Sequence, residues 1–204
     1  MTLTEWLALA AVCLMGAASP GPSLAVIVKH TLAGGRTQGL VGAWCHAGGI
    51  GVYAVATVFG LAGLLAVYPT VARGVTLAGA SYLMWLGVMA LRAGRLQGEV
   101  AVGQDVARNL GASARDGLVI ALLNPKIAVF FTALFSQFVQ ADAMVLSQWA
   151  MAGTAVVIDG LWYSLVALVL ARPTMLVRFQ AQSHWLNRVS GVLFIAIALR
   201  IAAG

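Results

Sequence analysis

The chain has 204 residues, of which 61% are hydrophobic and only 9% are charged, and its mean hydropathy is +0.94. Soluble domains carry about 25% charged residues, so this composition excludes an ordinary soluble protein and indicates an integral membrane protein. The formal net charge of +6 does not indicate a nucleic-acid partner, because no soluble module carries a basic stripe. The positive residues instead fit loops that flank membrane spans.

The first apolar segment runs from about Trp6 to Val28, which is long enough to cross a bilayer. It is interrupted by Ser19-Pro20-Gly21-Pro22-Ser23, and each proline in a helix interior costs about 3 kcal/mol. Unpaired backbone groups at membrane depth are tolerated only where they line a cavity or lie against protein, and broken helices hold the substrate in many transporters. This break therefore indicates a functional site. Because the segment lacks a basic n-region, we expect it to be retained rather than cleaved as a signal peptide.

Five further apolar segments follow, separated in the middle by a polar linker at about 93–116. Their ranges are about 39–68, 71–91, 117–139, 149–171 and 189–203. The fourth of the six segments is broken in turn, at Asn124-Pro125. The sequence therefore predicts an all-α membrane protein with six transmembrane helices, of which the first and the fourth are broken.

Lysine and arginine are unevenly distributed between the two sides of this arrangement. Nine of the twelve follow the first, third or fifth segment, whereas only Arg73 and Arg200 lie on the opposite side. Because positively charged loops stay in the cytoplasm, we predict a cytoplasmic linker at 93–116 and both termini on the outer side.

A short internal repeat relates the two halves of the chain. Pro22–Val26 and Pro125–Val129 share a Pro-x-aliphatic-Ala-Val pattern at corresponding places. Since each half, 1–92 and 117–204, contains three crossings, the halves are predicted to be inverted repeats, and paired breaks in such repeats indicate a central transport site. The residues predicted to bind substrate there are Ser19, Gly21, Pro22, Ser23, Asn124, Pro125 and Lys126. Amides exposed after each break would attract a carboxylate.

Asp159 is the most informative single residue, because it lies midway through the fifth segment. A carboxylate there costs about 2.5–3.5 kcal/mol on insertion scales, so it must face a cavity, find a partner or become protonated. We favour a role in proton coupling or in binding a substrate amine over a structural ion pair. Lys126 could bind a substrate carboxylate, pair with Asp159 in one conformation, or equally well extend to the membrane interface.

Three other features are interpreted as structural. His46 could relay protons, but it stands near the start of its segment, and we favour a packed, hydrogen-bonded histidine. Cys13 and Cys45 lie in apolar runs without metal-binding spacing, so we expect neither a disulfide nor a metal site. Small residues recur every four positions at Gly39, Ala43, Ala47 and Gly51, which suits close packing against a helix of this chain or of a second subunit.

Several motifs occur in order along the chain and extend this interpretation. They are Ser19-Pro20-Gly21-Pro22, Gly79-Ala80-Ser81-Tyr82-Leu83-Met84-Trp85-Leu86-Gly87 and Leu122-Leu123-Asn124-Pro125-Lys126-Ile127-Ala128-Val129-Phe130-Phe131, then Asp159 and Ser190-Gly191. In these motifs the sequence resembles the LysE/RhtB superfamily of amino acid exporters, and more closely its homoserine, threonine and neutral amino acid branch. The resemblance implies proton-driven export of small amino acids or related metabolites across a bacterial inner membrane. Family members commonly have asparagine where this chain has Ser23, so the substrate stays open.

Other classes of function were weighed against transport of an amino acid. A metal cation would need several converging oxygen or soft ligands, and one carboxylate deep in the membrane does not supply enough of them. A metabolite other than an amino acid stays open as the cargo. An intramembrane enzyme would need a nucleophile with a base, paired carboxylates or a metal motif, and none is visible in the sequence. We therefore expect a transporter that has no cofactor and no enzymatic activity, and whose partners are its substrate, the proton and membrane lipid.

Overall fold

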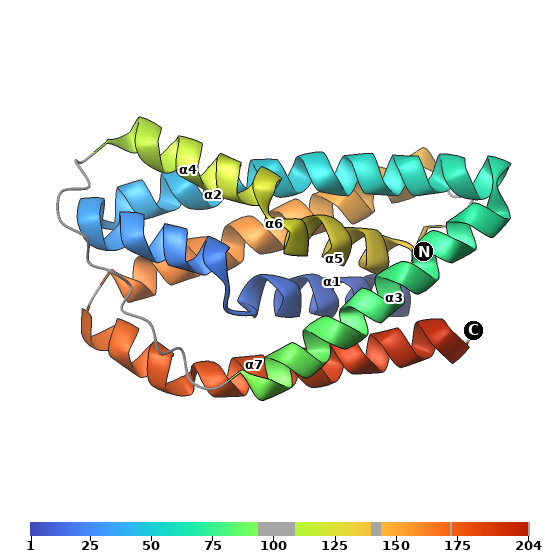
Figure 1. Ribbon diagram of the computed structural model, residues 1–204. Coiled ribbons are helices and arrows are strands. Elements are labelled where there is room, and N and C mark those ends of the chain that lie inside the picture. Colours follow the sequence, from blue (N-terminus) through green and yellow to red (C-terminus); the bar gives the residue numbers. More distant parts are fainter. Residues whose placement is uncertain (94–108, 140–143, 172, 204) are drawn as a thin grey trace.

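The computed structural model describes residues 1–93, 109–139, 144–171 and 173–203. These residues form seven helices, which lie roughly along one common direction as a bundle (Figure 1). The helices are α1 (Leu3–Ala18), α2 (Pro22–Val67), α3 (Pro69–Arg92), α4 (Leu110–Leu123), α5 (Pro125–Phe135), α6 (Val145–Leu170) and α7 (Pro173–Ala203). The chain is all-helical in its described part, as the sequence predicts.

Helix α2 consists of two helical parts and reverses direction between them at Gly35. This glycine has φ 80° and ψ −174°, a conformation that residues with a Cβ rarely adopt. Gln38 Nε2 lies 3.2 Å from His30 Nδ1, although eight residues of straight helix would separate them by about 12 Å. A methyl group added at Gly39 would likewise meet Thr31. Residues 22–34 and 36–67 are therefore two antiparallel arms, called the first and second arms of α2 below.

Four described helical segments contain stretches long and apolar enough to cross a membrane: Pro22–Leu64, which includes the reversal at Gly35, Thr70–Arg92, Val145–Val169 and Ala181–Ala202. The pair Leu110–Leu123 and Pro125–Phe135 passes the same test together and is bent by 57° at Asn124. Helix α1 is apolar but shorter than a span. The protein is thus a multi-pass membrane protein.

Two boundaries differ from those expected from hydropathy. The end of the predicted linker 93–116 is helical, because Asn109 caps α4 by accepting a hydrogen bond from the Ala112 amide at 3.2 Å. The rest of that linker, residues 94–108, lies outside the described residues. The last helix begins at Pro173 rather than near 189, because Ser183, Asn187 and Ser190 form a buried polar stripe that lowers the hydropathy without ending the helix.

The surface of the bundle is apolar and much of its polar content is internal. Trp85, Leu146, Trp149 and Leu161 are among many large hydrophobic side chains that are more than half exposed. By contrast, a set of polar side chains is buried, including Ser19, Ser23, His30, Gln38, His46, Asn124 and Asp159. Lipid tails cover apolar side chains at no cost, whereas buried polar groups need partners, so this distribution suits a bilayer.

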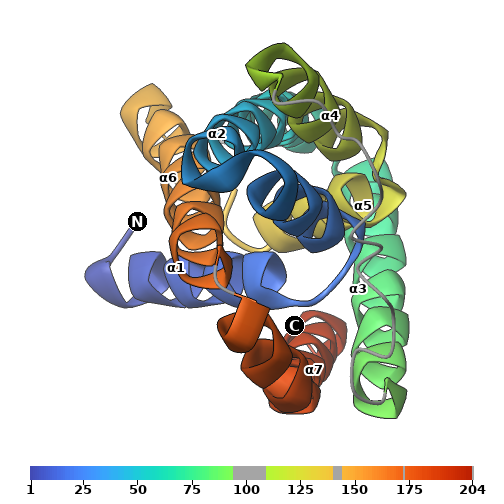
Figure 2. The same cartoon turned by 90° about the vertical axis from the view of Figure 1, so that its left-hand side faces the viewer.

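Helix packing brings the two halves of the chain together. The arms of α2 pack mainly against α4 and α6, and α3 packs mainly against α7. Where α3 packs against α7 the two backbones are close, because a methyl group added at Gly87 or at Gly191 would lie 2.8 Å from the carbonyl oxygen of the other glycine. Figure 2, viewed along the bundle, shows α5 and the first arm of α2 toward the middle, with α3, α4, α6 and α7 around them.

The two ends of the bundle differ in what they hold. Figure 1 shows both termini at one end, together with the turn between α2 and α3. The reversal within α2 and the starts of α4 and α7 lie at the opposite end. The positively charged links predicted to be cytoplasmic are attached to the helix ends on that second side.

Candidate functional site

The first break separates α1 from α2 at Ser19, Pro20 and Gly21. Helix α1 ends where the Ser19 amide donates to the Met15 carbonyl at 2.9 Å, and α2 begins with Pro22 as its first residue. Gly21 precedes it in an extended conformation and offers no side-chain cap. The first intrahelical bond of α2 runs from the Ala25 amide to the Gly21 carbonyl, at 3.2 Å. The amides of Ser23 and Leu24 have no acceptor within the helix and carry the positive end of its dipole.

The second break separates α4 from α5 at Asn124. Here the side chain does cap the following helix, because Asn124 Oδ1 accepts from the Lys126 amide at 3.0 Å. Pro125 occupies the first helical position, where its missing amide proton is not needed. The same dipeptide therefore ends one helix, starts the next and produces the bend of 57°.

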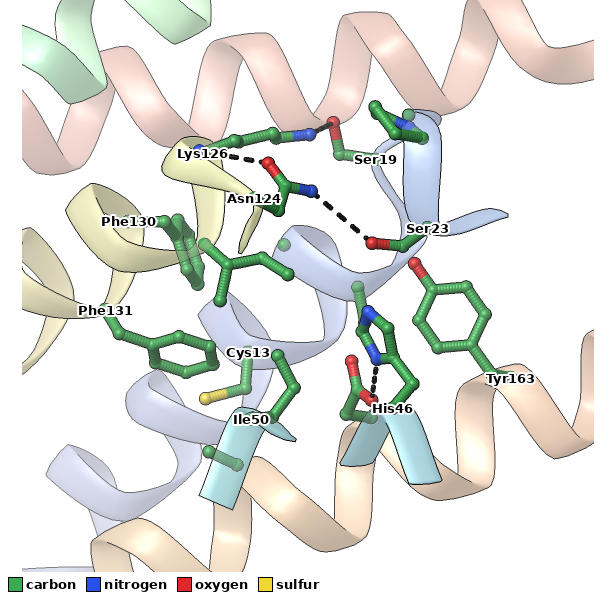
Figure 3. A pocket seen from close by; sticks show the side chains of 17 residues that line it. Cys13, Ser19, Ser23, His46, Ile50, Asn124, Lys126, Phe130, Phe131 and Tyr163 are labelled. Atoms are coloured by element: carbon green, nitrogen blue, oxygen red, sulfur yellow. Dashed lines mark hydrogen bonds and ion pairs between the residues drawn. The ribbon is translucent and has the colours of Figure 1, made fainter. Parts of the chain in front are cut away.

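Two hydrogen bonds join the breaks to each other. Lys126 Nζ donates to Ser19 Oγ at 2.9 Å, and Asn124 Nδ2 donates to Ser23 Oγ at 3.5 Å. Figure 3 shows both pairs facing each other at one side of a cavity. A Cβ added at Gly21 would lie 3.8 Å from the Lys126 ammonium, so that charge sits next to the uncapped start of α2. Two positively polarised groups, the ammonium and the helix N-terminus, thus lie side by side.

A carboxylate and an imidazole approach the cavity from α6 and α2. Asp159 Oδ2 lies 2.7 Å from His46 Nδ1, and the exposed fractions of the two residues are 6% and 1%. The Tyr163 ring meets His46 edge to face, with ring centroids 4.9 Å apart, and its hydroxyl points toward Ser23 (Figure 3). The imidazole therefore satisfies the buried carboxylate, which would otherwise be a costly unpaired charge.

These groups enclose a cavity of about 40 Å³. One water molecule needs about 10–15 Å³ of such cavity volume, so the cavity accommodates a ligand of several non-hydrogen atoms. Its lining combines the polar groups described above with apolar side chains. The lining residues are Cys13, Gly16, Ala17, Ser19, Gly21, Pro22, Ser23, His46, Ile50, Asn124, Lys126, Ile127, Phe130, Phe131, Ala155, Asp159 and Tyr163. A mostly apolar pocket with a few convergent polar groups is the usual form of a small-molecule site.

Most residues singled out from the sequence meet at this cavity. Ser19, Gly21, Pro22, Ser23, Asn124, Lys126 and Asp159 all line it, whereas Pro125 shapes the bend without lining the space. The Lys126 ammonium bonds to Ser19 in this structure rather than pairing with Asp159. Asp159 faces a cavity and has a partner at the same time.

His46 is the residue that the sequence interpretation undervalued. It is packed and hydrogen-bonded, as expected, but it also lines the cavity and pairs with Asp159. The small-residue stripe indicates that a helix packs closely on the second arm of α2, and the structure identifies that helix. Methyl groups added at Gly39 and Gly51 would meet Ala167 and Val156, so the second arm of α2 runs antiparallel to α6 in a register that sets His46 opposite Asp159.

A second polar cluster lies outside the cavity, where the two arms of α2 meet α4. His30 Nε2 is 3.0 Å from Asp116 Oδ2, and Gln38 is buried against His30. Ser113 Oγ donates to the Gln38 carbonyl at 2.6 Å. This cluster ties the first half of the chain to the second near the reversal at Gly35. Within the described residues, no group of three or more His, Cys, Asp or Glu residues could hold a metal ion.

Comparison with known proteins gives one family and several relatives. The family model of the LysE type translocator matches residues 14–204. The threonine efflux protein of Escherichia coli (strain K12) is 26% identical over 202 residues, which is 98% of each chain. The homoserine/homoserine lactone efflux protein of Salmonella typhi is 31% identical over 127 residues, covering 62% of this chain and 61% of the relative. No solved structure matches the chain.

Proposed function

The chain belongs to the LysE type translocator family, and on that basis we propose that it exports small amino acids or related metabolites from the bacterial cytoplasm. Translocators and efflux proteins are transporters, so the chain is not an enzyme. Relatives named for the efflux of threonine and of homoserine support an amino acid of similar size as the substrate.

The observation that carries this proposal is the convergence of two broken helices and a buried carboxylate on one cavity. An amino acid has a carboxylate and an ammonium group close together, so its site must offer both charges at short range. The uncapped start of α2 and Lys126 provide the positive side, and Asp159 provides the negative side. In the proposed complex the substrate carboxylate meets the amides of Ser23 and Leu24 and the Lys126 ammonium.

We propose that the fold is a six-span inverted repeat. The chain reversal at Gly35 supports this count, because α1 with the first arm of α2 forms one broken span and the second arm forms another. The pair α4 and α5 is the corresponding broken span of the second half. Helices α6 and α7 follow it, just as the second arm of α2 and then α3 follow the broken span of the first half. Rocking of these halves about the cavity would give alternating access.

The orientation follows from charge. The protein is proposed to lie in the inner membrane with the linker 93–116 cytoplasmic and both termini periplasmic, because nine of the twelve Lys and Arg residues follow the first, third or fifth segment. The cavity would then open alternately toward the reversal in α2 and toward the end that holds the termini.

Coupling to the proton gradient is proposed to run through Asp159. The substrate ammonium and a proton would compete for this carboxylate, so that entry of a proton releases substrate outward and binding of substrate releases the proton inward. Everted membrane vesicles with an acidic interior should then accumulate L-threonine or L-homoserine above the level reached without a pH gradient. Asp159→Asn should abolish that accumulation, and gradient-driven transport at the wild-type level in this variant would refute the coupling role.

A further inference from the structure

His46 holds the one buried polar atom at the cavity that has no partner in the described part of the chain. Three buried side-chain atoms there lack a hydrogen-bond partner: His46 Nε2, Trp162 Nε1 and Ser164 Oγ. Of these, only the histidine lines the cavity. Buried polar atoms are normally bonded, and exceptions in a native fold are often functional.

The short contact with Asp159 assigns different roles to the two ring nitrogens when this carboxylate is ionised. Nδ1 is 2.7 Å from the carboxylate, so Nδ1 then carries the ring proton and donates the hydrogen bond. Nε2 then holds the exchangeable position, with a lone pair in neutral imidazole and an N–H group in imidazolium. The second ring nitrogen points away from the bond drawn to the carboxylate (Figure 3).

Several titratable side chains share the cavity with His46. They are Asp159 and Tyr163 from α6, Cys13 from α1 and Lys126 from α5. Imidazole is the side chain whose ordinary titration lies closest to physiological pH.

We propose that His46 Nε2 is the atom that takes up the proton during the transport cycle, so that the proton competes with the substrate ammonium for Asp159 through the imidazole bonded to that carboxylate. This deepens the proposed function and rests on it. A proton entering from outside binds the Nε2 lone pair, and the resulting imidazolium neutralises Asp159, which then no longer holds the substrate ammonium. When substrate binds from the cytoplasm, its ammonium takes over the carboxylate and the Nε2 proton leaves to the cytoplasm. One proton enters for each substrate exported, and the Nδ1 proton stays in place.

The test uses His46→Gln in purified full-length protein reconstituted into liposomes. Glutamine is a side-chain amide that can still donate to Asp159 but does not titrate near neutral pH. Two activities are measured with radiolabelled L-threonine and L-homoserine. The first is exchange of substrate across the membrane with equal pH on both sides, and the second is accumulation of substrate driven by a pH gradient. We expect the variant to retain exchange and to lose gradient-driven accumulation down to the level without a gradient. His184→Gln is the matched control, because His184 is partly exposed on α7 and does not line the cavity.

The outcomes separate this inference from the proposed function. Gradient-driven accumulation that survives in the His46 variant overturns the inference. Loss of both exchange and accumulation in a well-folded variant also overturns it, because that result would assign His46 to substrate binding. Failure of the wild type to exchange either amino acid overturns the proposed function and the inference with it. If the variant does not fold, proton release by the wild-type protein is the remaining test that can overturn the inference. Substrate added to wild-type protein in weakly buffered detergent solution at neutral pH should acidify it, and the absence of acidification overturns the inference.

Discussion

Replacement of Lys126 by methionine tests the positive side of the proposed site. The Lys126 ammonium is held 2.9 Å from Ser19 Oγ and is next to Gly21, where the helix start is uncapped. Methionine keeps most of the aliphatic stem that packs in the cavity wall and removes only the charge. A ligand carboxylate bound there would lose its charge-assisted hydrogen bond.

The expected magnitude follows from that single contact. Hydrogen bonds to charged groups contribute about 1.5–3 kcal/mol, which corresponds to roughly a ten- to 150-fold change in affinity at 25 °C. Ser19→Ala is the matched control, because it removes the partner of the ammonium and leaves the charge. Because the ammonium that the ligand carboxylate needs remains in place, this variant should change the affinity less than Lys126→Met does.

The assay is exchange of labelled L-threonine in liposomes at a series of substrate concentrations. The half-saturating concentration should rise strongly for Lys126→Met and change only weakly for Ser19→Ala, while both proteins elute as the wild type does in size-exclusion chromatography. An unchanged half-saturating concentration in Lys126→Met would show that the lysine does not bind the substrate carboxylate, and the assignment of the positive side would then be refuted.

Two further predictions concern stability, measured as thermal unfolding in detergent. Gly87→Ala places a methyl group 2.8 Å from a backbone oxygen of α7 and should destabilise the protein by about 1–3 kcal/mol. In the control Gly74→Ala the added methyl group meets no atom within 4 Å, so this change should be neutral or stabilising. Equal effects of the two substitutions would contradict the close contact between α3 and α7. Asp116→Ala removes the partner of a buried histidine and should cost about 1–3 kcal/mol, against less than about 1 kcal/mol for Arg115→Ala, whose side chain is 75% exposed. A larger effect at Arg115 would refute the importance of the buried pair.

The two helix breaks could be predicted because they are local. Proline and its neighbours fix where a helix stops and restarts, whatever the rest of the chain does, and the structure breaks its helices at Ser19–Gly21 and at Asn124. The reversal at Gly35 is equally local in origin. The sequence places a gap between its first two segments there, and one glycine with positive φ is enough to fill it.

The pairing of His46 with Asp159 could not be predicted in the same way. The two residues are 113 positions apart, so their contact depends on the register of two packed helices. The depth of each residue within its own segment contains no information on that register. A stripe of glycine and alanine predicts that some helix approaches closely, but not which one, and the structure identifies α6. The early start of α7 was hidden for a related reason, since the average hydropathy of a window ignores which face each polar residue occupies.

The bonds from Lys126 to Ser19 and from Asn124 to Ser23 mean that a ligand arrives by substitution rather than by simple addition. A ligand carboxylate that accepts hydrogen bonds from Lys126 or Asn124 must first displace the serine hydroxyl oxygens to which these side chains already donate. Measured affinity is then the difference between two sets of bonds, and weak binding is the natural result. For an exporter this is an advantage, because cargo held loosely on one side of the bilayer is released readily on the other.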